Sequence, residues 1–325
     1  MKTDLTWKKL ILSLIAVGIS LPAIAAEPKK VLVVTVTTGF RHSSIPTAEK
    51  IIAQLGQESG AFTVVDYARQ PEAKLQNKPQ KPRTLGENAD ARAKARYDSE
   101  LKRYEADLAK YDESKAQSSK QEYDAQMKAS MSKLSADNLK NYDAVIFANT
   151  TGELPLPDRE AFINWVKAGH GFIAMHSGCD TYHNYKPYID MLGGEFQTHQ
   201  AQVEVDVPVR DKNHPATKHF GDKFKVFDEI YIIKSYDPAN VHELLSMDAH
   251  PNSKEPGHYA MSWCKNFGSG KVFYTSLGHR EDVWDAEWKD RKNSKEIAVA
   301  YQKHILGGIK WALGLEAGDA TPQAK

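Results

Sequence analysis

Three histidines stand directly after apolar runs that are typical of buried β-strands. His42 follows the run 31–36, His176 follows the run 172–175, and His279 follows the run 271–276. The carboxyl ends of parallel strands meet at one edge of a sheet, where α/β proteins bind their ligands. Histidine titrates near neutral pH, so imidazoles gathered at this edge could act as general acids and bases. The pattern predicts one site built from residues far apart in the sequence.

More polar residues accompany the same strand ends. A glycine pair, Gly193 and Gly194, predicts a helix end that turns the chain back across the sheet and delivers His199. The candidate catalytic residues are therefore His42, His176, His199 and His279. The candidate substrate-binding residues are Gly39, Phe40, Arg41, Thr150, Thr151, Gly152, Ser177, Asp180, Glu229 and Tyr231.

The loop 37–43 follows the first strand and opens a helix, so its amides favour an anion or an oxygen-rich ligand. Arg41 could hold a carboxylate or a polarised carbonyl there. The loop has neither the glycine spacing of a dinucleotide site nor the Gly-Lys-Ser/Thr of a P-loop. The alternative is a helix-capping loop with an exposed histidine.

His176, Ser177 and Gly178 form a strand-to-helix bend like the nucleophile elbow, which presents a catalytic side chain. A Ser177 or Cys179 nucleophile is less favoured, because Cys179 comes too late and the glycine pattern of the elbow is incomplete. The bend indicates His176 as an acid, a base or a ligand. A structural histidine bonded to the backbone is the alternative.

The same histidines, with Asp180, Asp228 and Glu229, also allow a zinc interpretation. The sequence lacks the short His-x-x-x-His, His-Glu-x-x-His and Cys-x-x-Cys spacings. We therefore assign no metal ligands and expect no cofactor. A divalent metal held by distant loops stays an alternative.

Strand-like and helical segments alternate along the chain, which predicts an α/β fold with a doubly wound, mostly parallel sheet and helices on both faces. The predicted helices span 46–55, 158–168 and 297–313. The predicted strands span 31–36, 62–67, 144–148, 172–175, 203–207, 229–234, 243–247 and 271–276.

A polar, charged segment at 71–137 interrupts this alternation. A heptad stripe of Tyr97, Leu101, Tyr104, Leu108 and Tyr111 predicts one long helix, and a second helix is expected after a break at 118–119. We interpret the segment as an inserted helical hairpin. It could be a flexible spacer, an arm for self-association or for a protein partner, or a hairpin packed on its own domain.

The N-terminus reads as a cleavable signal peptide over residues 1–25, with basic residues, an apolar run and Ala23-Ile24-Ala25. We expect a periplasmic or secreted protein without a membrane span, a main domain over 26–315 and a disordered tail over 316–325. A net charge of +1 excludes an electrostatic case for nucleic acid as a partner. Cys179 and Cys264 could pair, but two buried free thiols are favoured.

The motifs together resemble the ThuA-like (trehalose utilisation) family, over residues 30–70 and 138–315. They are the segments 39–43, 149–152, 171–178, 193–199, 214–215, 228–231 and 273–279. The resemblance implies the flavodoxin-like fold of class I glutamine amidotransferases. Those enzymes carry a cysteine where this chain has His176, so the resemblance does not imply glutamine hydrolysis. The long insertion departs from the family pattern.

ThuA-like proteins are linked to disaccharide catabolism, often through 3-keto sugars. The resemblance thus implies a carbohydrate-processing enzyme, a lyase or hydrolase, with a small carbohydrate as substrate. In this interpretation His176 or His42 is the base and His199 or His279 the acid. The alternatives are a non-catalytic carbohydrate-binding protein and a metal-dependent hydrolase.

Overall fold

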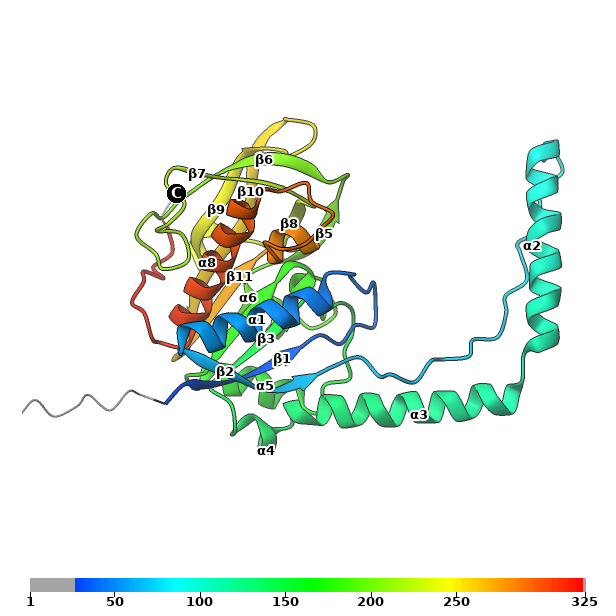
Figure 1. Ribbon diagram of the computed structural model, residues 1–325, viewed down its shortest axis with the longest axis horizontal. Helices are drawn as coiled ribbons and strands as arrows, with labels where there is room; N and C mark the ends of the chain where they lie inside the picture. The colour runs from blue at the N-terminus through cyan, green and yellow to red at the C-terminus, as the bar shows by residue number, and fades with distance from the viewer. Residues whose placement is uncertain (1–26, 324–325) are drawn as a thin grey trace, which may run out of the picture.

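The structure is a computed structural model that describes residues 27–323, so the expected signal peptide at 1–25 lies outside it. A seven-stranded sheet with the order β2-β1-β3-β4-β11-β10-β9 forms its centre (Figure 1). β2, β1, β3, β4 and β11 run parallel, and β10 and β9 are antiparallel. These strands are β1 (Lys29–Val34), β2 (Phe62–Ala68), β3 (Ala144–Ala148), β4 (Gly171–Met175), β9 (His242–Ala249), β10 (Pro256–Phe267) and β11 (Gly270–Thr275).

Helices cover both faces of this sheet. α1 and α8 pack on one face, and α5, α6 and the end of α3 pack on the other. The helices are α1 (Ile45–Ser59), α2 (Ala91–Lys110), α3 (Glu113–Met131), α4 (Ala136–Leu139), α5 (Arg159–Lys167), α6 (Lys186–Leu192), α7 (Glu281–Trp284) and α8 (Lys295–Ala312). Short 3₁₀ helices are η1 (Ser132–Leu134), η2 (His176–Asp180) and η3 (Pro238–Asn240).

Alternating side chains of each central strand enter opposite layers of the core. In β1, Val31 and Val33 pack with α1 and α8, whereas Leu32 and Val34 pack with α5 and α6. A parallel strand buried on both faces needs an unbroken apolar sequence, which explains the continuous runs. The prediction of a doubly wound, mostly parallel sheet with helices on both faces is confirmed.

Two small antiparallel sheets lie outside the main sheet and were only partly anticipated. They pair β5 (Glu195–His199) with β8 (Tyr231–Lys234), and β6 (Val203–Pro208) with β7 (Lys223–Asp228). The sequence pattern predicts no strands at β5, β7 and β10, because these segments mix polar and apolar residues. It also predicts a strand that begins at Glu229, which lies in the connection between β7 and β8.

The order of the strands reverses next to β1, which pairs with β2 on one side and β3 on the other. Ligands of doubly wound sheets bind at this point, beyond the carboxyl ends of the strands. A bridge between Thr37 and Thr151 joins the loops that follow β1 and β3. The fold therefore brings the loop with His42 beside the ends of β3 and β4.

The inserted segment is two helices in sequence, but they do not lie along each other as a hairpin would. α2 stands apart from the sheet, and α3 runs from it back to the domain at a steep angle to α2 (Figure 1). The break falls at Tyr111 and Asp112, where Asp112 accepts a hydrogen bond from the Lys115 amide, and α3 continues through the expected break at 118–119. No helix among residues 27–323 has the length and apolar character needed to cross a membrane.

Only the C-terminal end of α3 joins the core, where Met127 and Met131 are buried. Gln70 donates a hydrogen bond to the Tyr123 hydroxyl at 2.7 Å, which ties α3 to the loop after β2. α2 has no buried residue, so its heptad stripe has no partner among the described residues.

Residues 316–323 lie against the domain, in contrast to the disordered tail expected there. Trp311 Nε1 donates to the Gly318 carbonyl at 3.1 Å, and His242 contacts the Thr321 carbonyl at 2.7 Å. Ala320 is buried. These contacts could not be predicted from the short polar sequence, because they depend on backbone carbonyls and one small side chain.

The burial of His304 on α8 predicts that the protein loses stability in mild acid. Its imidazole is fully buried and contacts the Ala216 carbonyl at 2.8 Å, and burial lowers its pKa to about 3. The unfolded chain binds a proton near the ordinary pKa of 6.5, so the stabilising contribution is complete above that pH and is lost as the pH falls toward 3. Between pH 7 and pH 5 this one group should lower the free energy of unfolding by about 2 kcal/mol.

Urea denaturation of the wild type and of His304→Gln at both pH values measures this contribution. The variant should lose about 2 kcal/mol less than the wild type between pH 7 and pH 5. His214 and His219, which lie nearby, remain in both proteins. Identical pH dependence in the two proteins would contradict the assignment.

Candidate functional site

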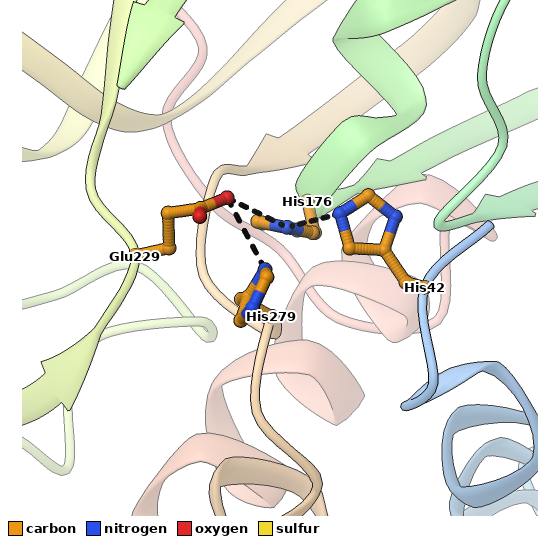
Figure 2. Close-up of side chains that lie close together, drawn as sticks. All are labelled: His42, His176, Glu229 and His279. Carbon is orange, nitrogen blue, oxygen red and sulfur yellow. Dashed lines mark hydrogen bonds and ion pairs between the residues drawn. The ribbon is translucent and has the colours of Figure 1, made fainter. Parts of the chain in front are cut away.

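His42, His176, Glu229 and His279 converge beyond the carboxyl edge of the sheet, and we call them the imidazole cluster (Figure 2). One nitrogen or oxygen atom from each residue lies within 4.8 Å of those of the other three. His42 comes from the loop after β1, His176 follows β4, and His279 follows β11. Glu229 comes from the connection between β7 and β8. The predicted convergence of three strand ends is thus observed.

His176 is the innermost member, and its backbone is held in the left-handed region at φ 48°. Non-glycine residues with such φ values are uncommon and collect at functional sites. The His176 ring contacts the Ser276 carbonyl through Nδ1 at 2.8 Å. A carbonyl can only accept, so Nδ1 carries the proton and the neutral ring presents a lone pair at Nε2.

Two groups face that lone pair. The Tyr231 hydroxyl lies 2.9 Å from His176 Nε2, and His42 Nε2 lies 3.2 Å from it. The other nitrogen of His42 lies 3.2 Å from the Ser177 hydroxyl. Phe40, which is 67% exposed, packs its ring edge-on against His42 with 4.8 Å between the ring centroids.

Glu229 links the cluster to two rings that reach solvent. Its Oε1 lies 3.0 Å from His199 Nδ1, and its Oε2 lies 3.2 Å from His279 Nδ1. The side chains of His199 and His279 are 44% and 22% exposed, whereas that of Glu229 is 9% exposed. Pairing of His199 with Tyr231 across β5 and β8 sets the position of the exposed ring.

Burial separates the proton affinities of the three strand-end imidazoles. Burial, assisted by His279, lowers the pKa of His42 to about 4. Burial and the neighbouring rings of His42 and His279 lower the pKa of His176 well below its ordinary value. Burial alone would lower the pKa of His279, but the Glu229 and Asp228 carboxylates raise it above its ordinary value. The cluster therefore combines neutral inner rings with an outer ring that binds protons more readily.

Two residues outside the predicted catalytic and substrate-binding sets position the cluster. Asp228 is fully buried and accepts hydrogen bonds from the Gly278 amide at 2.7 Å and the Arg280 amide at 3.3 Å, on either side of His279. Asn149, at φ 56°, donates from Nδ2 to the Ser44 hydroxyl and to the Gly278 carbonyl. An acid at the end of β7 and an asparagine directly after β3 were the available sequence signals.

Several predicted binding residues make contacts within and between the loops that surround the cluster. Arg41 donates to the Thr35 carbonyl at 2.8 Å, and within the described chain no hydrogen bond or ion pair joins it to the cluster. The Thr150 hydroxyl pairs with Thr181, and Thr151 donates to the Phe40 carbonyl. Gly152 packs so tightly on Thr38 and Gly39 that a Cβ atom would clash. Their observed contacts hold the loops after β1, β3 and β4 together.

Asp180 lies beside the cluster and is held by a second histidine. His183 Nε2 lies 2.7 Å from Asp180, and His183 Nδ1 lies 2.5 Å from Glu195. His183 is not among the residues predicted from sequence. Cys179 is fully buried, and burial raises the pKa of its thiol. Cys179 and Cys264 are both free and buried, so they do not form a disulfide.

Two solved structures of ThuA-like proteins share this fold. One, from Parabacteroides merdae ATCC 43184, is 16% identical with a TM-score of 0.53, and the match covers 88% of this chain and 90% of that one. The other, from Bacteroides uniformis ATCC 8492, is 17% identical with a TM-score of 0.54, covering 90% and 95%. At these identities the likeness shows the fold alone. No curated protein matches the sequence.

The family model described as ThuA, trehalose utilisation, matches residues 97–312. This range contains His176, His199, Glu229 and His279, while His42 precedes it. The match covers well over half of the chain and agrees with the fold of the two solved relatives. The chain belongs to the ThuA (trehalose utilisation) family.

Proposed function

We propose that this protein is a carbohydrate-processing enzyme that acts on a disaccharide or an oxidised (3-keto) glycoside through proton transfer at the imidazole cluster. The observation that carries the proposal is a buried carboxylate, Glu229, contacting two partly exposed imidazoles at the carboxyl edge of the sheet. The family's description as trehalose utilisation supports a sugar substrate. The predicted signal peptide makes the periplasm or the exterior the expected location.

The contacts suggest which groups exchange protons with a substrate. Glu229 faces the Nδ1 atoms of His199 and His279, and within residues 27–323 their Nε2 atoms have no hydrogen-bond partner. A carboxylate on one ring nitrogen fixes the tautomer and strengthens the other nitrogen as a base. One ring can remove a proton beside a carbonyl while the other protonates the leaving oxygen. A positioned acid or base of this kind contributes typically about 10²–10⁴-fold.

The buried histidines have supporting roles in this scheme. His176 is fully buried and His42 is 5% exposed, so neither reaches a substrate in the present conformation. This differs from the expectation that His176 or His42 is the base. The buried Cys179 offers no accessible thiol, which supports a reaction other than glutamine hydrolysis.

A panel of unmodified and 3-keto disaccharides, read by mass spectrometry, tests the proposal. We expect loss or gain of a defined mass, such as that of water, for at least one sugar, and a fall of about 100-fold or more in His199→Gln. His250→Gln, a replacement outside the cluster, is the matched control. Sugar binding without any mass change would instead favour the non-catalytic carbohydrate-binding protein.

A further inference from the structure

We propose that the imidazole cluster is a site for one divalent transition-metal ion, with zinc as the reference ion and His42, His176, His279 and Glu229 as its ligands. The proposal adds a bound ion to the proposed function but rests on the geometry of the cluster alone.

The spacing of the four potential ligand atoms matches a compact coordination shell. His42 Nε2 and His176 Nε2 are 3.2 Å apart, His176 Nε2 and Glu229 Oε2 are 3.9 Å apart, and Glu229 Oε2 and His279 Nδ1 are 3.2 Å apart. A tetrahedral zinc ion with bonds of about 2.0–2.1 Å places its ligands about 3.4 Å from each other. All of the ligand atoms lie within 4.8 Å of one another, so small side-chain shifts complete the shell.

Within residues 27–323, one of these atoms lacks a hydrogen-bond partner and another faces more groups than it can accept from. The single lone pair of His176 Nε2 faces both the Tyr231 hydroxyl and His42 Nε2, and it can accept only one well-directed bond. His279 Nδ1 is buried and has no well-directed hydrogen bond to any described residue, although Glu229 Oε2 lies 3.2 Å away. Unsatisfied buried polar atoms are rare and point to an unseen ion or water. A cation would be bound by lone pairs of His42 Nε2 and His176 Nε2, which lie 3.2 Å apart.

The charge of Glu229 also favours a cation. Among the described residues its ion-pair partners are all imidazoles, His176, His199 and His279, and none is a lysine or an arginine. A buried carboxylate is costly unless a positive charge or a metal compensates it. A divalent ion supplies that charge at the centre of the cluster.

Three of the four proposed ligands have a second contact of the kind that orients metal ligands. His176 Nδ1 donates to the Ser276 carbonyl, and His42 Nδ1 contacts the Ser177 hydroxyl. The second oxygen of Glu229 contacts His199. Metal-bound histidines almost always use their other nitrogen in this way. Three imidazoles and one carboxylate, without sulfur, suit zinc and its first-row neighbours better than calcium or magnesium.

The test measures zinc and cobalt binding to the full chain, purified without an affinity tag and stripped with a chelator. We expect one zinc ion per chain by elemental analysis after equilibrium dialysis, and a cobalt form with the strong visible bands of a four-coordinate ion. His279→Asn and His42→Asn should each weaken zinc binding by more than the roughly 10–100-fold that loss of an outer partner costs. His258→Gln, which alters a histidine–glutamate pair outside the cluster, should bind like the wild type.

Circular dichroism and thermal unfolding identify any variant that fails to fold, and the two ligand variants provide independent readings. Zinc bound equally by the wild type and both ligand variants, or no stoichiometric zinc in the wild type, would overturn the metal site. Sugar conversion by the stripped protein without zinc binding would remove the metal site and keep the proposed function. Stoichiometric zinc binding with no sugar converted in any metal form would keep the metal site and remove the proposed function.

Discussion

Glu229→Gln is expected to reduce turnover of the responsive sugar by about 10³-fold while the protein stays folded. The two carboxylate oxygens face different rings, His199 at 3.0 Å and His279 at 3.2 Å. Glutamine has the same shape but no charge, and it turns an N–H group toward one of the two rings. Neither ring then keeps the carboxylate that orients it.

Steady-state kinetics with the sugar identified in the panel measure the loss, and chemical denaturation measures the fold. The free energy of unfolding should change little, because glutamine keeps the shape of glutamate and removes a buried charge that is costly to desolvate. Glu204→Gln alters an exposed carboxylate on β6 that pairs with Lys225, and it should leave turnover unchanged. Near-normal turnover in Glu229→Gln would contradict the proposed function.

Asp228→Asn is expected to lower both stability and turnover through the loop that carries His279. The Asp228 oxygens accept from the Gly278 and Arg280 amides, so an asparagine must direct its own N–H₂ group at one of these donors. An unsatisfied buried amide costs about 1–3 kcal/mol of unfolding free energy. Displacement of His279 should reduce turnover about 10–100-fold, as for other residues that orient a reactive group.

Denaturation curves and kinetics on the same preparation separate the two effects. Asp222→Asn, at an exposed side chain paired with Lys212, should change stability by no more than about 0.5 kcal/mol and leave turnover unchanged. A loss of stability in Asp228→Asn with normal turnover would mean that Asp228 supports the fold but does not position His279.

The central sheet and its reactive edge could be predicted from local sequence. The bounds predicted for β3 coincide with those observed, and those of β4 and β11 differ by one residue. Continuous apolar runs are required of any parallel strand buried on both faces, so their ends also mark the sheet edge. That is why His42, His176 and His279 were identified as members of one site.

The partners of those histidines could not be predicted in the same way. His176 and Tyr231 are joined across 55 residues of chain, through two small sheets in which only one strand of each was predicted. Arg41 is adjacent to His42 in sequence, yet its guanidinium bonds to the Thr35 carbonyl. Side-chain direction depends on which donors and acceptors the packed loops leave unpaired, and this is not a local property.

The amino-acid sequence by itself determined the layers of the fold and the edge where chemistry is possible, because apolar patterning acts over neighbouring residues. The tertiary structure alone decided that Glu229 contacts three imidazoles, that Asp228 holds the loop of His279, and that α2 stands apart from the domain. These outcomes depend on contacts between distant segments, whose geometry is set only when the whole core packs.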